Sequence, residues 1–369
     1  MVVMPSIRTQ PYGLTVVGGR MGVVGVPGFL LGGGISFFGN EYGWASANIA
    51  SYECVLADGT ILNATATNEF SDLFWALRGG GNSFAIVTSF ALKTIQASAV
   101  TVGQNSYGTG LRDEYLDSVF GFAFDGGLDK KAAITPTVTW TSSTGSDFAY
   151  SSFLFYNGNV TAPPALSNFT GPDALLPAAS STFSYRPFSD WSNETETGFE
   201  RVHGMVFRFH VLSFRANREA MEFIHDTFLS MASQRLANVT NSLATLAMMP
   251  ISESFISTNR NGTAGDPMGI DATKAPYIWV EEAIMHANPA DTPKVDQFLI
   301  DVNAIIDEKL TSLNVASPYL YLNDADKNQP VFQGYAPENV ARLKEIRSKY
   351  DPQSIYTDQM PGGWKVAAI

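Results

Sequence analysis

The sequence has almost no cysteine, and this absence limits both its disulfide chemistry and its metal chemistry. Cys54 is the single cysteine in 369 residues, so neither an internal disulfide nor a cysteine metal cluster can form. We expect Cys54 to be a small buried residue in a strand. The four histidines show no metal-ligand spacing such as His-Glu-x-x-His. We interpret them as ordinary side chains and predict no metal site.

Positive charge is also scarce, and long hydrophobic runs are missing. The chain has 23 basic and 35 acidic residues, a net charge of −12. A field of this sign argues against nucleic acid and anionic membrane surfaces as partners. The longest apolar stretch, Val16 to Phe38, is interrupted by Arg20 and Pro27. We therefore expect no membrane-spanning segment.

Two features bear on localisation and point in opposite directions. The first ten residues lack the charged start and continuous apolar segment of a secretory signal. The chain nevertheless has more Asn-x-Ser/Thr sequons than its composition alone predicts. They are Asn63, Asn159, Asn168, Asn193, Asn238 and Asn261. We expect a secreted or secretory-pathway glycoprotein, although the chain shows no signal peptide.

The length predicts two domains, and the hydrophobic pattern changes near residue 97. Residues 12–96 are rich in glycine, with short apolar runs between turns. The turn Ala57-Asp58-Gly59-Thr60 lies between two such runs and predicts a β-hairpin. A short helix is expected over 71–77, with Ser71 as its cap.

Residues 97 to about 325 alternate between apolar and polar positions, which is typical of an antiparallel sheet with one covered face. Helical patterns over 219–236 and 292–313 interrupt the alternation, and Asp291 is the expected cap of the second helix. A last helix is predicted over 337–349. Residues 159–181 contain four prolines and two sequons, which favours an exposed loop.

The densest chemical signal is a glycine run from Gly18 to Gly34. Glycine at this density lets main-chain N–H groups approach a large flat or anionic ligand, because no Cβ stands in the way. Tight turns without a ligand would explain the run equally well. The run is not a phosphate-binding loop, because no Gly-Lys-Ser/Thr follows. It is not a dinucleotide fingerprint, because no amphipathic helix is expected to start here.

A second glycine cluster, Arg78-Gly79-Gly80-Gly81-Asn82, follows the predicted short helix. Gly79 is a natural helix stop. The next two glycines exceed what a stop requires, which again indicates close backbone approach.

These motifs together resemble one family. They are the run Gly18 to Gly34, Tyr42-Gly43, Asn48-Ile49, Val55-Leu56-Ala57-Asp58-Gly59, Asp72 to Asn82, Tyr321-Leu322-Asn323 and Tyr350-Asp351-Pro352. In this order they resemble the FAD-linked oxidoreductases of the vanillyl-alcohol-oxidase type, in the berberine-bridge-enzyme-like branch. The resemblance spans the whole chain.

The resemblance implies an α+β protein with a partial FAD-binding domain of the PCMH type and an inserted substrate domain. The substrate domain would be an antiparallel sheet backed by helices. The second part of the FAD-binding domain would cover 1–96, the substrate domain 97–330, and a C-terminal segment returning to the FAD domain 331–369. We expect no counterpart, before the glycine run, of the N-terminal subdomain whose histidine holds FAD in the family.

The resemblance also implies the cofactor site. The main chain of the glycine run would lie along FAD, and Ile86 and Val87 would reach its adenosine side. Tyr321 and Asn323 would approach the flavin ring and active site. The candidates from the run are Met21, Gly22, Val23, Gly25, Gly28 and Gly32.

Several departures from the family pattern affect the chemistry. Met21 replaces the cysteine that forms a second covalent link to FAD in some members, and methionine cannot form it. Pro27 replaces a usual glycine and removes an N–H donor, and Ala85 replaces another. Asp324 stands where many members have a tyrosine that activates the substrate hydroxyl.

We predict Tyr321 and Asp324 as catalytic residues. Asp324 could accept a proton from an alcohol if burial raised its pKa, whereas a solvated loop acid is the simpler explanation. Glu281 and Glu282 are weaker candidates, and strand alternation places only one of them on the buried face.

The expected function is FAD-dependent oxidation of an alcohol or C–H bond in a small secondary metabolite or sugar. Hydride would pass to flavin N5, and molecular oxygen would be the electron acceptor. Two alternatives stay open. One is a truncated or degenerate homologue that cannot hold FAD, and the other is a secreted glycoprotein that binds a ligand without turnover.

Overall fold

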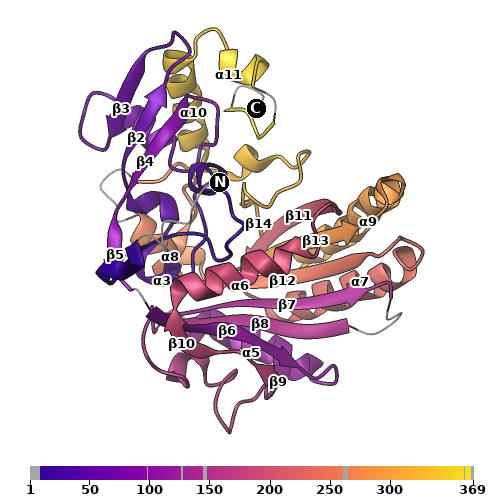
Figure 1. The fold of residues 1–369 in the computed structure, drawn as a ribbon. Helices are drawn as coiled ribbons and strands as arrows, with labels where there is room; N and C mark the ends of the chain where they lie inside the picture. The colour runs from indigo at the N-terminus through magenta and orange to yellow at the C-terminus, as the bar shows by residue number, and fades with distance from the viewer. Residues whose placement is uncertain are drawn as a thin grey trace. The chain divides into compact units, whose positions relative to one another are not determined.

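The computed structural model describes residues 9–97, 99–125, 128–143, 148–260, 265–360 and 362–366. The chain folds into two compact units (Figure 1). The first unit comprises Met1–Ser98, Ser254–Ala272 and Pro318–Ile369. The second unit comprises Ala99–Glu253 and Thr273–Ser317.

The first unit contains, among its described residues, a three-stranded antiparallel sheet of order β3-β2-β4 and a small antiparallel pair, β1-β5. The strands are β1 (Leu14–Val16), β2 (Ile49–Val55), β3 (Ile61–Thr65), β4 (Ile86–Leu92) and β5 (Thr94–Gln96). The helices are α2 (Val26–Leu31), α3 (Gly39–Tyr42), α4 (Ser71–Ala76), α8 (Glu253–Arg260, at the boundary of the units), α10 (Pro337–Tyr350) and α11 (Ile355–Asp358).

The predicted hairpin is confirmed. β2 and β3 pair with Val55 opposite Ile61, and Gly59 takes a φ of +85° in the connecting turn, which glycine adopts without a steric cost. Cys54 is fully buried in β2, as expected. The predicted cap of α4 is wrong: Ser71 is the first helical residue, and no side chain caps the helix.

Polar side chains at the end of α10 join this helix to α4. Tyr350 Oη donates to Asp72 Oδ1 at 2.7 Å, and Lys349 Nζ lies 2.6 Å from Asp72 Oδ2. Asp351 is fully buried and accepts hydrogen bonds from the N–H groups of Ile355 and Tyr356. The Tyr-Asp-Pro sequence therefore has a structural role in this unit.

The second unit is built on a sheet of nine antiparallel strands among its described residues. The order is β10-β6-β8-β7-β12-β13-β11-β14, and β9 also pairs with β6. The strands are β6 (Ala99–Tyr107), β7 (Ala132–Thr141), β8 (Phe148–Tyr156), β9 (Ala178–Ser181), β10 (Ser184–Pro187), β11 (Val206–Arg215), β12 (Leu243–Ile251), β13 (Tyr277–His286) and β14 (Ala316–Ser317).

Three helices cover one face of this sheet: α5 (Arg112–Asp125), α7 (Arg218–Arg235) and α9 (Thr292–Ser312). Alternate residues of the strands, such as Tyr150 and Leu154 of β8, join these helices in one hydrophobic core. The intervening residues point to the other face, because successive strand residues alternate. There Phe153 contacts Trp191 of α6 (Phe188–Glu200) with ring centroids 5.1 Å apart.

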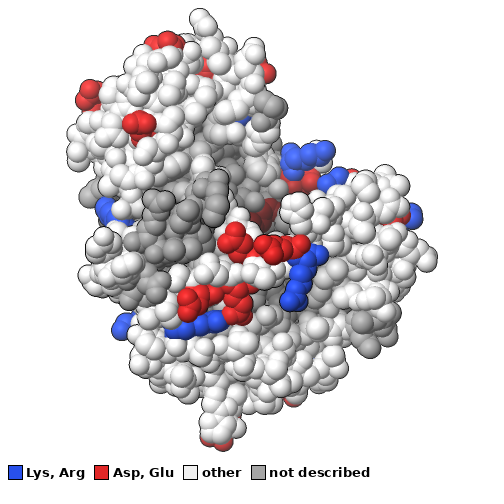
Figure 2. Space-filling view, in the orientation of Figure 1, with Lys and Arg blue, Asp and Glu red and all other residues white. Residues whose placement is uncertain are grey.

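Acidic side chains gather where α6 lies at the surface (Figure 1 and Figure 2). Its exposed acids are Asp190, Glu194, Glu196 and Glu200. Arg186 on β10 pairs with Glu194 and lies over the Trp191 ring. This local excess agrees with the negative net charge of the whole chain.

Two predictions for the second unit are wrong in part. Asp291 precedes α9 but does not cap it with its side chain, because its carboxylate accepts hydrogen bonds from Thr240 and Lys294. Residues 159–181 are not a simple exposed loop, since they place three apolar side chains in the core. These are Leu166, Phe169 and Leu176.

The units also divide the chain differently from the predicted ranges. Ser254–Ala272 and residues 318–330 group with the first unit rather than with the sheet of the second. Phe255 packs edge-on against Trp44, and the Ala336 N–H donates to the Met268 carbonyl, so the 254–272 segment has its partners in the first unit.

Within the described part of the chain, the helices fall short of the length and apolar character that crossing a membrane would require.

Candidate cofactor and active site

The glycine run has two structurally different halves. Its first half leads from β1 into α2, whose first turn contains Pro27. A Cβ added to Gly25 or Gly28 would meet no atom within 4 Å. The backbone there is open, so a flat ligand could lie directly on it. The sequence predicted no amphipathic helix of the dinucleotide-binding kind at this run. The structure has a short helix of six residues, α2, inside the run.

The second half of the run is packed by protein side chains. A Cβ on Gly32 would lie 2.1 Å from Asn323 Oδ1. Gly33 and Gly34 have φ of +97° and +82°, and a Cβ on Gly34 would lie 2.8 Å from the Phe29 ring. The Gly32 N–H donates to the Gly28 carbonyl. These glycines are therefore required by the fold itself.

Tyr321 and Asn323 lie against this second half, and both group with the first unit. The Tyr321 hydroxyl accepts hydrogen bonds from the Ile35 N–H at 3.0 Å and from Asn323 Nδ2 at 2.9 Å. Asn323 Nδ2 also donates to the Phe29 carbonyl at 3.0 Å. A pair of side chains close to the C-terminus thus fixes the glycine run through hydrogen bonds to its main chain.

The surroundings of Tyr321 keep its hydroxyl neutral. The ring is 5% exposed and stacks on Trp44 with centroids 6.0 Å apart. Burial raises the pKa of Tyr321, the charge of Asp324 adds to this, and Arg20 opposes it. Tyr321 is therefore suited to donating or accepting hydrogen bonds rather than to acting as an anionic base.

Asp324 is half-buried, and its N–H donates to the Tyr321 carbonyl at 3.2 Å. It is therefore not a fully solvated loop acid. Its carboxylate lies close enough to raise the pKa of both Tyr319 and Tyr321, after the larger contribution of burial.

The two glycine clusters are joined by a main-chain hydrogen bond. The Gly81 N–H donates to the Leu31 carbonyl at 3.1 Å. Gly79 has a φ of +142°, and its carbonyl accepts from Tyr335 Oη at 2.7 Å. A Cβ on Gly79 would also meet Met268 Sδ at 2.2 Å. Close packing of the protein explains Gly79 without a ligand.

The remaining cofactor candidates lie at more open positions. Met21 and Gly22 are half-buried, and Val23 is 41% exposed in the turn before α2. Ile86 is 48% exposed at the start of β4, and Val87 beside it is half-buried. Within the described part of the first unit, β4 is an edge strand that pairs only with β2.

Glu281 and Glu282 of β13 lie on opposite faces of the second unit's sheet, as alternation predicted. Glu282 is fully buried on the face covered by α9, where Asn303 Nδ2 donates to its Oε2 at 2.6 Å. Glu281 is half-buried on the other face, opposite Val211 and Ala247. Of the two, Glu281 is the one on the face opposite α5, α7 and α9.

Several residues around the site were not predicted from the sequence. Trp44, Met268 and Tyr335 support the glycine clusters as described above, and buried Arg78 donates from Nε to the Ser46 carbonyl. The buried Asp266 accepts a hydrogen bond from the Gly269 N–H. Of these residues, only Arg78 could have been suggested by the local sequence, because it directly precedes three glycines.

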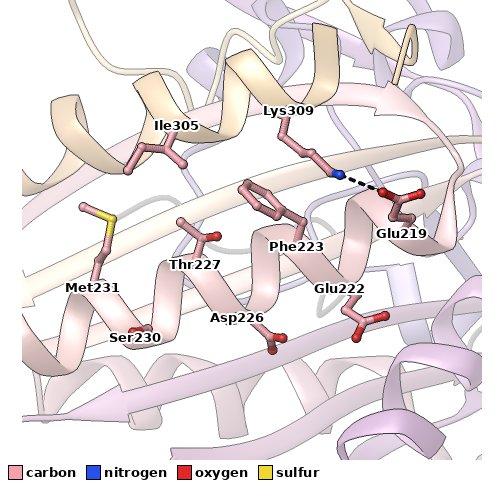
Figure 3. Close-up of a pocket in the computed structure, with 9 residues that line it drawn as sticks. All are labelled: Glu219, Glu222, Phe223, Asp226, Thr227, Ser230, Met231, Ile305 and Lys309. Carbon is pink, nitrogen blue, oxygen red and sulfur yellow. Dashed lines mark hydrogen bonds and ion pairs between the residues drawn. The ribbon is translucent and has the colours of Figure 1, made fainter. Parts of the chain in front are cut away.

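A surface trough of about 640 Å³ lies between α7 and α9 of the second unit (Figure 3). Phe223, Met231 and Ile305 form its apolar part, and Lys309 pairs with Glu219 at one end. The residues that line it all belong to the second unit, whereas both glycine clusters belong to the first. In the described residues, no group of three or more His, Cys, Asp or Glu side chains could hold a metal ion.

The residues present fit FAD at the first half of the glycine run. The backbone at Gly25 and Gly28 offers an open, Cβ-free surface, and Tyr321 and Asn323 fix the adjoining half. Neutral hydrogen-bonding groups and exposed main chain suit a large, flat and largely uncharged ring system.

Comparison with known proteins agrees with this fit. No protein-family model matches the chain. The FAD-dependent monooxygenase prx3 of Penicillium roqueforti is 30% identical over 362 residues, which cover 96% of this chain and 69% of that protein. The FAD-dependent monooxygenase drtC of Aspergillus calidoustus is 28% identical, with coverage of 98% and 67%.

Solved structures with the same fold are flavoenzymes. The chain is similar to 6-hydroxy-D-nicotine oxidase from Arthrobacter nicotinovorans, with a TM-score of 0.71, 19% identity and coverage of 96% and 75%. It is also similar to berberine bridge enzyme from Eschscholzia californica, with a TM-score of 0.69, 18% identity and coverage of 98% and 74%. Together with the curated relatives, these similarities show that the chain belongs to the FAD-linked oxidoreductases of the vanillyl-alcohol-oxidase type, with FAD as the cofactor of the family.

Proposed function

We propose that this FAD-linked oxidoreductase oxidises an alcohol or a C–H bond of a small secondary metabolite or sugar and passes the electrons to molecular oxygen. FAD, when bound, accepts a hydride at N5 and supplies the redox chemistry. The protein then has to position the substrate and accept a proton. Relatives whose names refer to monooxygenases and to a solanapyrone synthase, and an Acremonium strictum glucooligosaccharide oxidase of the same fold, support both substrate classes.

One observation carries this proposal. The backbone at Gly25 and Gly28 is open, and the second half of the glycine run beside it is fixed by Tyr321 and Asn323. In this proposal the first unit holds FAD, with Met21, Gly22 and Val23 lining the same turn and Ile86 and Val87 reaching the adenosine.

The proton would be accepted by Asp324 or Glu281. Asp324 is favoured by its position next to Tyr321, whose hydroxyl would orient the substrate or flavin ring. Glu281 is favoured by its place on the sheet face opposite α5, α7 and α9. Asp324→Asn and Glu281→Gln separate the two, because only loss of the true base lowers kcat while leaving flavin content unchanged.

FAD binding tests the site directly. Gly25 has φ −69° and ψ 124°, which valine adopts without strain, so Gly25→Val places a side chain in the open space without disturbing the fold. Gly110→Val is the matched control, since Gly110 also has no atom within 4 Å of a Cβ and lies in the second unit. We expect wild type and Gly110→Val to retain flavin absorbance after gel filtration with FAD, and Gly25→Val to lose it.

Two outcomes would reject this assignment. A wild-type protein that stays colourless after FAD addition would favour the alternative of a homologue that does not hold FAD. Equal flavin content in Gly25→Val and wild type would show that FAD does not bind at the first half of the glycine run. Oxygen consumption with candidate substrates then tests molecular oxygen as the acceptor.

A secretory location remains part of the proposal. Among the sequons in the described residues, Asn63, Asn159, Asn193 and Asn238 are exposed, whereas Asn168 is half-buried; Asn261 lies outside the described residues. The exposed sites could carry glycans on the folded surface. Glycan mass on the protein from its native source would support secretion, and unmodified sequons there would argue against it.

A further inference from the structure

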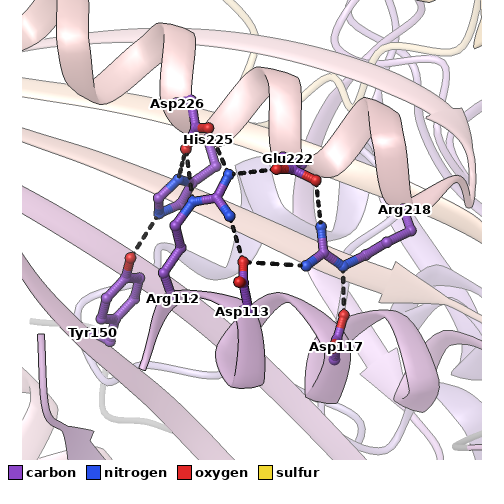
Figure 4. A network of polar contacts seen from close by, with 8 residues as sticks. All are labelled: Arg112, Asp113, Asp117, Tyr150, Arg218, Glu222, His225 and Asp226. Carbon is purple, nitrogen blue, oxygen red and sulfur yellow. Dashed lines mark hydrogen bonds and ion pairs between the residues drawn. The ribbon is translucent and has the colours of Figure 1, made fainter. Parts of the chain in front are cut away.

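A buried tyrosine and a buried histidine in the second unit form a hydrogen-bonded chain that leads to the surface (Figure 4). Tyr150 of β8 is fully buried, and its hydroxyl lies 2.9 Å from Nε2 of His225 on α7. His225 is 2% exposed, and its Nδ1 lies 2.8 Å from Asp226 Oδ1. Arg112 of α5 pairs with both Asp226 oxygens.

The surrounding charges fix the protonation states of this chain. Burial lowers the pKa of His225, and the hydrogen bond with Asp226 offsets this only in part. Partial burial raises the pKa of Asp226, but hydrogen bonds from Arg112 and His225 lower it overall. At neutral pH the imidazole is neutral and Asp226 is ionised, so Nδ1–H donates to Asp226. Nε2 is left to accept the Tyr150 proton.

The neighbouring buried tyrosine lacks this arrangement. Tyr115 of α5 is 1% exposed, and its ring lies 4.7 Å from the Tyr150 ring, centroid to centroid. Its hydroxyl has no hydrogen-bond partner among the described residues. The two phenols therefore share one apolar environment, and only Tyr150 is provided with a base.

This difference matters for one-electron oxidation. A phenol that loses an electron becomes strongly acidic and must release its proton, so it is oxidised readily only where a base is already hydrogen-bonded to it. We propose that Tyr150 is a redox-active tyrosine. It loses one electron to an external oxygen radical such as the hydroxyl radical, which is reduced to hydroxide, and its O–H proton moves to His225 Nε2 as the tyrosyl radical forms. The resulting imidazolium is stabilised by ionised Asp226.

The geometry gives the radical both protection and a return path. Tyr150 is inaccessible to solvent, which limits side reactions of the radical. The proton stays within hydrogen-bond distance and returns to the phenol when an external reductant supplies an electron. The proposed activity is the trapping of oxidising equivalents within the second unit. It does not depend on flavin binding or on the proposed substrate oxidation.

The test uses the full chain without added FAD and a ruthenium tris-bipyridine complex that light and persulfate convert to a one-electron oxidant. Transient absorption and EPR detect the tyrosyl radical. We expect Tyr150→Phe to remove the fast-forming radical and Tyr115→Phe, the matched control, to keep it. Loss of a positioned proton acceptor is expected to slow radical formation about a hundredfold in His225→Gln.

Asp226→Asn keeps the inference testable if His225→Gln does not fold, because Asp226 lies at the surface with 53% of its side chain exposed. It removes the charge that stabilises the imidazolium, and we expect slower radical formation with unchanged circular dichroism. The proposal is overturned if Tyr150→Phe retains the fast signal. It is equally overturned if folded His225→Gln or Asp226→Asn forms the radical at the wild-type rate.

Discussion

Replacing Glu282 by glutamine is expected to stabilise the protein at alkaline pH. The Glu282 side chain is fully buried beneath α9, and its Oε1 has no hydrogen-bond partner among the described residues. Burial raises the pKa of the carboxyl to about 8, the hydrogen bond from Asn303 opposes this in part, and the charge of Asp307 adds to it. The folded protein therefore holds Glu282 largely as the neutral acid at pH 7.

The sign and size of the effect follow from the two pKa values. In the unfolded chain the pKa is near 4.5. Because the folded pKa is higher, the contribution of this proton to stability is complete below pH 4.5, declines as the pH rises, and is lost above pH 8. The difference between the two limits is roughly 4 to 5 kcal/mol at 1.36 kcal/mol for each pKa unit. Glutamine has nearly the shape of the protonated acid and no charge at any of these pH values.

Urea unfolding followed by circular dichroism between pH 5 and pH 9.5 measures this difference. Glu282→Gln and wild type should have similar free energies of unfolding near pH 5, and the variant should gain several kcal/mol over wild type by pH 9.5. Glu281→Gln, one residue away on the opposite sheet face, is the matched control and should follow the wild-type curve. If the free energies of unfolding of Glu282→Gln and wild type changed in parallel with pH, Glu282 would not be a neutral acid in the folded protein.

Three further substitutions test the packing of the first unit. Tyr321→Phe removes the hydroxyl that accepts from Ile35 and Asn323; we expect a loss of about 1–3 kcal/mol, and an unchanged Tm would contradict it. Gly32→Ala places a Cβ against Asn323 and should cost about 1–3 kcal/mol, part of which the double change with Asn323→Ala should restore in urea unfolding. Asp351→Ala removes the acceptor at the start of α11; hydrogen exchange there should speed up, and unaltered protection would count against the capping role.

Much of the secondary structure was predictable from local patterns. The Asp58-Gly59 hairpin and the helices α7, α9 and α10 follow from turn residues and hydrophobic periodicity, and the antiparallel sheet of the second unit follows from its alternation of apolar and polar residues. Helices α5 and α6 were missed. The apolar side of α5 is interrupted by buried Ser118, and α6 mixes buried Ser189 and Ser192 with its aromatic residues, so neither shows a continuous apolar stripe.

The site depends on contacts that no local pattern contains. Asn323 and Tyr321 bond to the main chain of Phe29 and Ile35 across almost 300 residues of sequence. The motif resemblance suggested these residues, but their hydrogen bonds required the fold. In the same way, alternation separated Glu281 from Glu282, yet only the position of α9 shows which of them is buried.

The division of the glycine run into an open and a packed half has a consequence for sequence variation. Substitutions at Gly32, Gly33 and Gly34 meet protein atoms and should lower the yield of folded protein whether or not FAD is supplied. Substitutions at Gly25 and Gly28 enter empty space and should leave yield intact while altering flavin content. A saturation library sorted first for expression and then for flavin fluorescence would therefore map the boundary between folding and cofactor constraints within one continuous motif.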